Sequence, residues 1–205
     1  MDMNIKYGSI MKYIGVFLIL LLVGCVSSPP YPKAKINGKY EILGAKIYSP
    51  NELGWYLIQH SQNSITFGTI PTSTDSVIAN INLFWVGEFD KDKDFLEFII
   101  AERYKNNDKE RWFNRVVENN FITFKGNSCF SYKTVAEDHK SKSKSRKSFQ
   151  YYNTIGNICR HPANKNTAIQ VEVSYRADSR EIPVAIKAIA ERFINNLELL
   201  GDEVG

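Results

Sequence analysis

The side chains best suited to nucleophilic or metal chemistry in this sequence are three cysteines and three histidines. Cys25 ends an apolar run near the N-terminus, whereas Cys129 and Cys159 lie much later in the chain. A thiolate can attack a substrate or bind a metal ion, and an imidazole can act as acid, base or ligand. Three cysteines can also form one disulfide and leave a single thiol for modification. The surroundings of each residue decide between these chemistries.

The segment before Cys25 has the pattern of an export signal. Lys6 and Lys12 precede an apolar run over residues 14–24. At eleven residues this run is short of the ~20 that cross a bilayer. The quartet Leu-Val-Gly-Cys that ends in Cys25 resembles the lipobox of bacterial lipoproteins. The resemblance implies a diacylglyceryl group on the thiol, cleavage of residues 1–24 as a signal peptide, and an amino terminus acylated, for example by palmitate. An uncleaved anchor with an incidental cysteine is the alternative.

Residues 25–40 are predicted to form a lipidated tether. Pro29 and Pro30 within it favour extended backbone, which holds a domain away from a surface. The residue after Cys25 is Val26. In lipoprotein families an Asp at this place tends to retain the protein in the inner membrane. We therefore expect a bacterial cell-envelope protein that is membrane-anchored and faces the periplasm, at the outer membrane rather than the inner one.

The basic character of the chain is concentrated in the segment HKSKSKSRKS, residues 139–148. The formal net charge is +4, and this segment alone contributes five bases, so the remainder does not form a nucleic-acid-binding surface. The five bases are Lys140, Lys142, Lys144, Arg146 and Lys147. They are candidate contacts for an anionic envelope polymer or protein, and a solvated hairpin tip is the alternative. No nucleic-acid partner is expected.

Cys129 and Cys159 are predicted to form a disulfide. Exported domains meet an oxidising compartment, in which an even pair of cysteines is normally bonded. Both flanks of the basic segment are rich in aromatic and β-branched residues, which favours a hairpin around it. The midpoint of the two cysteines nearly coincides with the centre of that segment, so the hairpin places them opposite each other. The same register pairs Phe130 with Ile158, Thr134 with Thr154 and Ala136 with Tyr152.

The competing interpretation of these two cysteines is a metal site with His161. Such a site lacks a fourth ligand at the usual spacing, and oxidation removes the thiolates that it needs. His139 does not complete it, because the hairpin places His139 and His161 at opposite ends, roughly 30 Å apart. We therefore expect no metal ion and no cofactor.

The sequence shows no catalytic motif. It contains no Gly-x-Ser-x-Gly elbow, Walker loop or dinucleotide fingerprint, and no Ser-x-x-Lys is placed at the start of an expected helix. The Ser-x-x-Lys inside the basic segment belongs to a low-complexity run. Asp92 and Asp94 are better explained as residues that stabilise a helix N-terminus. We expect no catalytic residue. The alternative is an envelope enzyme of the hydrolase type, with a site built from scattered residues around His60 or His161.

Hydrophobic periodicity predicts the elements that must position these residues. Strands are expected at 55–59, 64–70, 77–85 and 168–175. Two further strands are expected on the two sides of the basic segment. An irregular strand is expected at 112–125, with a break at 118–120. Helices are expected after the acidic stretch 89–94 and from Pro183 onwards. The order predicts a single α+β domain over residues 41–201, an antiparallel sheet with two helices packed on it.

Two segments indicate their buried faces most clearly. In the strand 77–85 the apolar face is Val77, Ala79, Ile81, Leu83 and Trp85. In the last helix the apolar stripe is Ile182, Ile186, Ile189, Phe193 and Leu197. Both sets are expected to face the hydrophobic core.

Four short motifs follow one another along residues 50–200. They are Gly-x-x-Cys ending at Cys129, Ala-Glu-Asp from Ala136, Gly-x-x-Cys-x-His-Pro from Gly156, and Tyr175 ahead of the last helix. Together with the lipobox they resemble a family of uncharacterised bacterial lipoproteins. The predicted fold is similar to that of the photosystem subunit PsbP and the lipoprotein DcrB. The resemblance implies an anchored envelope domain with a disulfide and no known activity. We therefore expect a lipid-anchored protein with a binding or scaffolding role.

Overall fold

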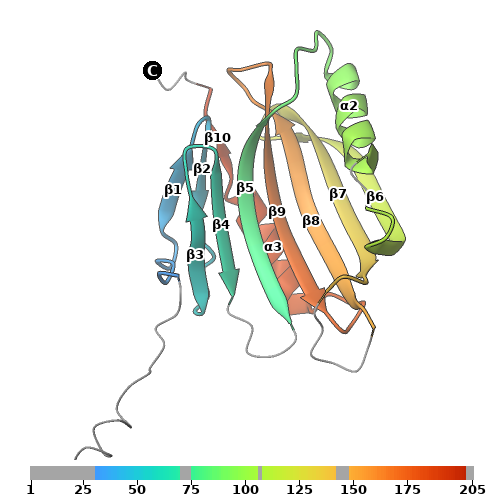
Figure 1. The fold of residues 1–205 in the computed structure, drawn as a ribbon. Coiled ribbons are helices and arrows are strands. Elements are labelled where there is room, and N and C mark those ends of the chain that lie inside the picture. The colour runs from blue at the N-terminus through green and yellow to red at the C-terminus, as the bar shows by residue number, and fades with distance from the viewer. Residues whose placement is uncertain (1–30, 70–74, 106–107, 142–147, 202–205) are drawn as a thin grey trace, which may run out of the picture. The chain divides into compact units, whose positions relative to one another are not determined.

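A seven-stranded antiparallel sheet is the framework of the computed structural model, which describes residues 31–69, 75–105, 108–141 and 148–201 (Figure 1). Its strands are β3 (Trp55–His60), β4 (Ser64–Thr69), β5 (Ser76–Trp85), β6 (Trp112–Phe124), β7 (Asn127–Asp138), β8 (Gln150–Arg160) and β9 (Thr167–Ala177). Their order across the sheet is β3-β4-β5-β9-β8-β7-β6. The helices of the described residues are α2 (Asp92–Lys105) and α3 (Val184–Asn195). The predicted α+β class, an antiparallel sheet with two packed helices, is confirmed.

A second sheet of three short strands was not predicted. It contains β1 (Lys39–Ile42), β2 (Ala45–Tyr48) and β10 (Glu198–Leu199), in the order β1-β2-β10. Strands of two to four residues are too short to show an alternating pattern, so periodicity could not find them. The turn between β1 and β2 contains Gly44 at φ +77°, a left-handed conformation that favours glycine.

The folded unit begins at Tyr31, within the segment predicted to be a tether. The backbone N–H of Ala34 donates to the carbonyl of Trp55 at 2.9 Å, and that of Leu57 donates to Pro32. These bonds hold the start of the unit along β3. Residues 31–40, predicted as part of the tether, thus contact the folded unit, and the tether itself stays a prediction. The predicted signal peptide, 1–24, and the rest of the tether lie outside the described residues.

One face of the large sheet packs against α3. Alternate residues of the central strands are buried there, namely Val77, Ala79 and Ile81 of β5 and Ile169, Val171 and Val173 of β9. From the predicted helical stripe, Phe193 and Leu197 are fully buried and the three isoleucines are partly buried. Trp85, also predicted to face this core, is 75% exposed because β5 ends at that residue.

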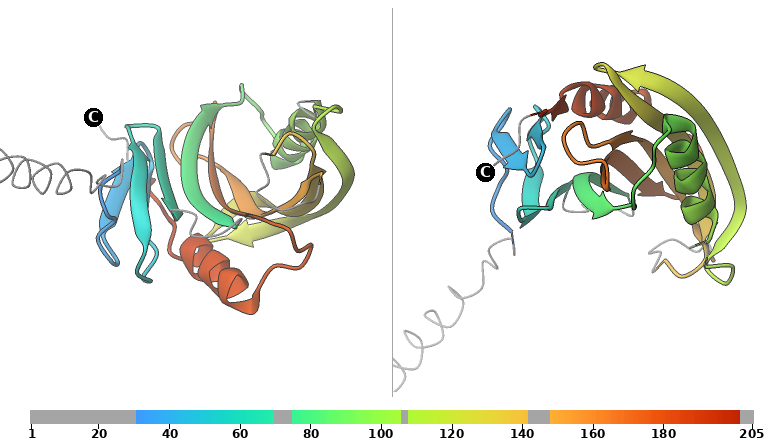
Figure 2. Two further views of the ribbon diagram at one scale, coloured as in Figure 1. Left: turned by 60° about the horizontal axis from the view of Figure 1, so that its bottom comes forward. Right: turned by 90° about the horizontal axis from the view of Figure 1, so that it is seen from above.

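The opposite face of the same sheet carries a second core against α2. Phe95, Leu96 and Ile99 of the helix pack on Phe130, Tyr132, Ile158 and Ala168 of β7, β8 and β9. Adjacent strand residues point to opposite faces, and Ala168 belongs to this core while Ile169 belongs to the first. The two helices therefore cover opposite faces (Figure 2). Asp92 and Asp94 lie in the first turn of α2, as predicted, where their charge favours the helix dipole.

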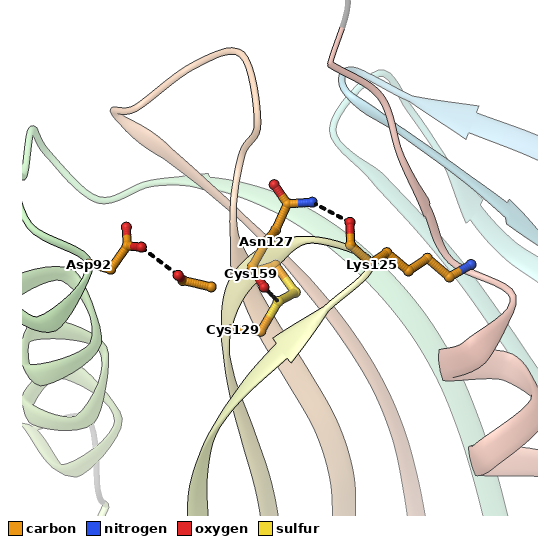
Figure 3. Close-up of a disulfide and its surroundings, with 6 residues drawn as sticks. Asp92, Lys125, Asn127, Cys129 and Cys159 are labelled. Carbon is orange, nitrogen blue, oxygen red and sulfur yellow. Dashed lines mark hydrogen bonds between the residues drawn. A yellow bond between two sulfur atoms is a disulfide. The ribbon is translucent and has the colours of Figure 1, made fainter.

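The hairpin of β7 and β8 has the predicted register. Cys129 lies opposite Cys159, and the other predicted pairs, including Thr134 with Thr154, are also present. The two Cα atoms of the cysteines are 4.1 Å apart, and their sulfur atoms are bonded (Figure 3). Beside them the hydroxyl of Ser128 hydrogen-bonds to Asp92 of α2. The disulfide therefore lies at the end of the hairpin that adjoins the start of α2.

The edge strand β6 differs from its prediction. It runs without a break from Trp112 to Phe124, through the segment 118–120 that was expected to interrupt it. Its irregularity lies earlier, where the register with β7 shifts between Phe113 and Val116. Asn114 within this shift has φ +47°, a left-handed conformation that asparagine tolerates better than most residues. The bulge therefore forms there.

Candidate ligand-binding site

A cavity of about 340 Å³ lies between α2 and strands β5 to β9. Its apolar lining comprises Phe84, Ile99, Trp112, Ala136, Tyr152 and Ile158. Its polar lining comprises Glu102, Arg103, Arg115, Thr134, Thr154, Gln170 and Glu172. An apolar cavity with a few polar groups, toward the small end of roughly 300–1,000 Å³, is typical of small-molecule sites.

Two threonine hydroxyls on the floor of this cavity have no hydrogen-bond partner. Thr134 of β7 and Thr154 of β8 lie directly opposite each other. Their side chains point to the α2 face, and the residues are only 6% and 5% exposed. Neither Oγ1 atom finds a partner. Buried hydroxyls are normally satisfied, and an unsatisfied one costs about 1–3 kcal/mol. A ligand polar group between the two strands could bond both.

Next to the threonines, a tyrosine of β7 reaches across β8 to a carboxyl group on β9. The hydroxyl of Tyr132 donates to Glu172 Oε2 at 2.7 Å, and Gln170 Nε2 donates to the Tyr132 hydroxyl at 2.6 Å. The residue between them on β8 is Gly156. A Cβ atom there would lie 2.6 Å from the Tyr132 hydroxyl and 2.7 Å from the Val171 carbonyl. Only glycine leaves room for this crossing.

The protonation of this group of residues follows from its burial. Burial raises the pKa of the Glu172 carboxyl above its ordinary value, although the Tyr132 hydrogen bond and the charge of Arg103 act in the opposite direction. Burial also raises the pKa of Tyr132 and of Tyr152, and the charge of Glu172 adds to both. Both phenols therefore stay protonated at neutral pH. The carboxyl group takes up a proton more readily than an exposed glutamate.

Arg103 of α2 forms one wall of the cavity. Its guanidinium carbon lies 3.5 Å from the centre of the Tyr132 ring, a cation–π contact. Its Nε is buried and has no hydrogen-bond partner. The backbone carbonyl of Arg103 accepts a long bond, 3.4 Å, from Arg115 of β6, which ties the helix to the edge strand. The wall therefore presents a donor with no acceptor.

An ion-pair cluster around the buried Asp138 supports the end of the cavity at Tyr152. Asp138, fully buried, accepts two hydrogen bonds from Arg111, at 2.9 and 2.8 Å, and its Oδ2 lies 2.9 Å from Arg176. Burial alone would raise the pKa of Asp138, but the two guanidinium groups outweigh it and lower the pKa. Arg176 also stacks on the ring of Tyr152, 5.2 Å from its centre. The cluster holds this aromatic wall in place.

His161, considered above as a metal ligand or catalytic residue, has a structural role. Its Nδ1 accepts hydrogen bonds from the backbone N–H groups of Ala163 and Asn164, at 3.1 and 3.0 Å. The neutral ring therefore carries its proton on Nε2. Nε2 lies against Gly44, where a Cβ atom would be only 1.7 Å away. Burial lowers the pKa of His161, which keeps the ring neutral.

The other two histidines, His60 and His139, contact different groups. The ring of His60 meets Tyr40 edge to face, and His139 Nε2 lies 3.0 Å from Glu137 at an exposed turn. In the described part of the chain, no hydroxyl or carboxylate group hydrogen-bonds to His60 or His161. No cluster of three metal-ligating side chains occurs among the described residues. The alternative of an envelope enzyme with a site around His60 or His161 therefore stays an untested hypothesis.

The candidate anion-binding residues are only partly within the described structure. Lys140 forms ion pairs with Asp108 at 3.0 Å and Glu110 at 3.3 Å. The other candidates, Lys142, Lys144, Arg146 and Lys147, lie outside the described residues, as does the lipidation candidate Cys25. Across the ranges that are described, no helix is long and apolar enough to cross a membrane. Anchoring and anion binding therefore stay predictions.

Sequence reasoning missed the cavity, although it named some of the residues. Thr134 and Thr154 were paired by register, but nothing marked them as unsatisfied. Glu172 alternates with apolar residues in β9 and reads as an exposed strand position. The one usable signal was Gly156, because a glycine inside a strand often marks a close approach of other atoms. The covering helix α2 could not be placed on this face from the sequence.

Comparisons with known proteins give a weak likeness. No protein-family model matches the sequence, and no curated protein is significantly similar to it. Among solved structures, the Ran-binding protein Mog1p of Saccharomyces cerevisiae is 10% identical, with a TM-score of 0.45 over 82% of this chain and 97% of that one. A mutant of Mog1 is 11% identical, with a TM-score of 0.47 over 80% of this chain and 96% of that one.

A third solved structure comes from Bacteroides thetaiotaomicron. It is 17% identical, with a TM-score of 0.42 over 80% of this chain. The present chain spans about half of that protein, 49% of its length. Identities this low give no information about function.

Proposed function

We propose that this chain is a lipid-anchored cell-envelope protein whose folded domain binds a small molecule in the cavity under α2. The observation that carries the proposal is the pair of buried, unpartnered hydroxyls of Thr134 and Thr154 on the cavity floor. Keeping two such groups costs stability, which a bound ligand would recover by bonding to them. Binding without catalysis is also consistent with the absence of a catalytic motif from the sequence.

Anchoring is supported by the N-terminal segment. The lipobox-like quartet ends at Cys25 and follows a short apolar run with two lysines before it. The remaining two cysteines are bonded to each other, which suits an oxidising, exported compartment. Cys25 is therefore the one cysteine left for a lipid.

The binding part is tested by filling the cavity. Ala136 lines it and is 2% exposed, so Ala136→Leu adds three carbon atoms inside the site. Ala101→Leu adds the same atoms on the exposed side of α2 and serves as the matched control. Protein purified from its native envelope is denatured, and released small molecules are identified by mass spectrometry. We expect the wild type and Ala101→Leu to release the same compound and Ala136→Leu to lose it.

Two outcomes would contradict the binding role. One is a wild-type protein that releases no compound above a mock purification. The other is an Ala136→Leu protein that still folds and releases the same compound in the same amount. The anchor is tested separately by metabolic labelling with palmitate and membrane fractionation. We expect Cys25→Ala to lose the label, and a Cys25→Ala protein that remains acylated would disprove the anchor.

A further inference from the structure

The unsatisfied polar atoms around the cavity can all act as donors. Arg103 Nε carries a hydrogen that it donates to no acceptor, and the hydroxyls of Thr134 and Thr154 can each donate one hydrogen bond. Tyr132, over which the guanidinium of Arg103 lies, is two residues before Thr134 on the same face of β7. Residues two apart on a strand lie roughly 7 Å apart. The three donors therefore converge on one part of the cavity.

The charges that line the cavity balance one another. Arg103 and Arg115 face Glu102 and Glu172. Burial raises the pKa of Glu172, so this carboxyl group takes up a proton more readily and carries less negative charge against the arginines. A neutral Glu172 would leave the lining positive.

Charged groups behind the cavity lining add to its positive charge. Arg111 stacks on Trp112 at 4.4 Å and Arg176 stacks on Tyr152 at 5.2 Å, so both cationic groups lie against aromatic rings that line the cavity. They share the single carboxylate of Asp138. Two guanidinium groups thus share one carboxylate, although the charge of Asp108 also acts on Arg111. The site as a whole favours an anion.

Building on the proposed binding role of this cavity, we propose that its ligand is a small organic carboxylic acid with an apolar body. The carboxylate accepts hydrogen bonds from Thr134, Thr154 and Arg103 Nε, and the body packs against Trp112 and Tyr152. Charge-assisted hydrogen bonds of this kind are stronger than those between neutral groups. The mostly apolar lining fits the body of such an acid better than it fits a sugar, whose hydroxyls need many partners.

Glu172 gives this ligand a distinctive pH dependence. The group faces Tyr132 on β7, Tyr152 on β8 and Arg103 on α2, with Glu102 and Arg115 in the surrounding lining. A carboxylate placed near Glu172 disfavours its charged form and raises its pKa further. Binding then takes up a proton, so affinity falls as pH rises. A cationic ligand would instead release a proton and bind more tightly at higher pH.

The test compares four probes on the mature protein, anchored at Cys25 in lipid nanodiscs, with protein-free nanodiscs as the blank. The probes are 3-phenylpropionate, its uncharged amide, the corresponding 3-phenylpropylamine, and glucose. Ligand-observed NMR and calorimetry measure binding at millimolar concentrations, and calorimetry in buffers of different ionisation enthalpy measures protons exchanged. We expect the acid to bind at least about tenfold more tightly than the others, with proton uptake.

Matched variants separate a ligand contact from a structural role. Thr134→Val and Thr154→Val remove only the hydroxyl, whereas Thr123→Val makes the same change at an exposed position of β6. Each cavity variant should weaken binding of the acid by about tenfold. The same variants should keep or raise the melting temperature of the free protein, because an unsatisfied buried hydroxyl is removed. Thr123→Val should change neither.

The results distinguish failure of the carboxylate assignment from failure of the binding role. Equal or tighter binding of the amide, the amine or glucose overturns the carboxylate assignment and leaves a small-molecule cavity in place. Binding of the acid that is unaffected by Thr134→Val and Thr154→Val also overturns it. No binding of any probe overturns both this assignment and the proposed binding role.

Discussion

At the scale of single residues, Gly156 is the position on which the floor of the cavity depends. It lets the Tyr132 hydroxyl pass over β8 to Glu172. We expect Gly156→Ala to lower the free energy of unfolding by about 1–3 kcal/mol, since the new methyl group meets the Tyr132 hydroxyl and the rigid Val171 carbonyl. Urea unfolding measures this.

The control for this substitution is Gly68→Ala. Its new Cβ would meet only the ends of the flexible side chains of Ile58 and Ile78, so a smaller loss is expected. A double-mutant cycle with Tyr132→Phe tests the contact itself, because removal of the hydroxyl should recover part of the cost of Gly156→Ala. Strictly additive effects would show that the two residues do not interact.

His161 is predicted to make stability depend on pH. In the folded protein its pKa is lowered by burial, and its Nδ1 accepts two backbone hydrogen bonds only when unprotonated. As pH falls, His161 in the unfolded chain takes up a proton at a higher pH than His161 in the folded protein. The stability that the neutral ring contributes is therefore complete above the ordinary histidine pKa of about 6.5 and is lost as pH falls below it. Stability should therefore decrease from about pH 7 to about pH 5.

The variant His161→Asn isolates this effect. The Oδ1 atom of asparagine can accept the same backbone bonds but does not titrate in this range. The urea midpoint of the variant should change less between the two pH values than that of the wild type. All other side chains, Glu172 among them, are the same in both proteins, so their contributions cancel in the difference. Parallel pH profiles for the two proteins would rule out His161 as the source.

At the scale of elements, the hairpin of β7 and β8 combines a predicted register with a disulfide. A bond that closes a loop of 30 residues stabilises by about 3–4 kcal/mol in the chain-entropy model, and by less if the hairpin persists in the unfolded chain. We expect Cys129→Ala with Cys159→Ala to lower the melting temperature. In the wild type, neither thiol should react with a maleimide before reduction. Rapid labelling of unreduced, folded protein would disprove the bond.

Most elements could be predicted because their residues repeat with a clear period. β5 and β9 alternate, and the stripe of α3 follows helical spacing. β1, β2 and β10 were missed, since their few residues carry no period and their pairing joins the two ends of the domain. The bulge of β6 was misplaced because asparagines occur at both places, and only Asn114 adopts the left-handed conformation.

At the scale of the whole molecule, the candidate site could not be read from the sequence. The cavity draws on α2 and on five strands, from Phe84 in β5 to Glu172 in β9. Its members were each recognised as parts of strands or helices. What makes them a site is that α2 covers the sheet face where Thr134 and Thr154 meet, and no local pattern records which face a helix covers.

The same arrangement predicts that the two cores unfold together. They lie on opposite faces of one sheet, and β9 contributes Ile169 to one core and Ala168 to the other. Loss of either core therefore exposes one face of the strands that the other core needs, which favours a single cooperative transition. Trp55 lies in the core under α3, and Trp112 lines the cavity under α2.

These two tryptophans report on the two faces separately. Phenylalanine at both other tryptophan positions gives one protein that fluoresces only from Trp55 and another that fluoresces only from Trp112. We expect each urea curve to coincide with the far-UV circular dichroism curve of the same protein. An earlier transition for Trp112 alone would show that α2 and the cavity open while the other core stays folded. Ligand entry could then proceed by partial unfolding, whereas coincident curves require the ligand to enter the folded protein.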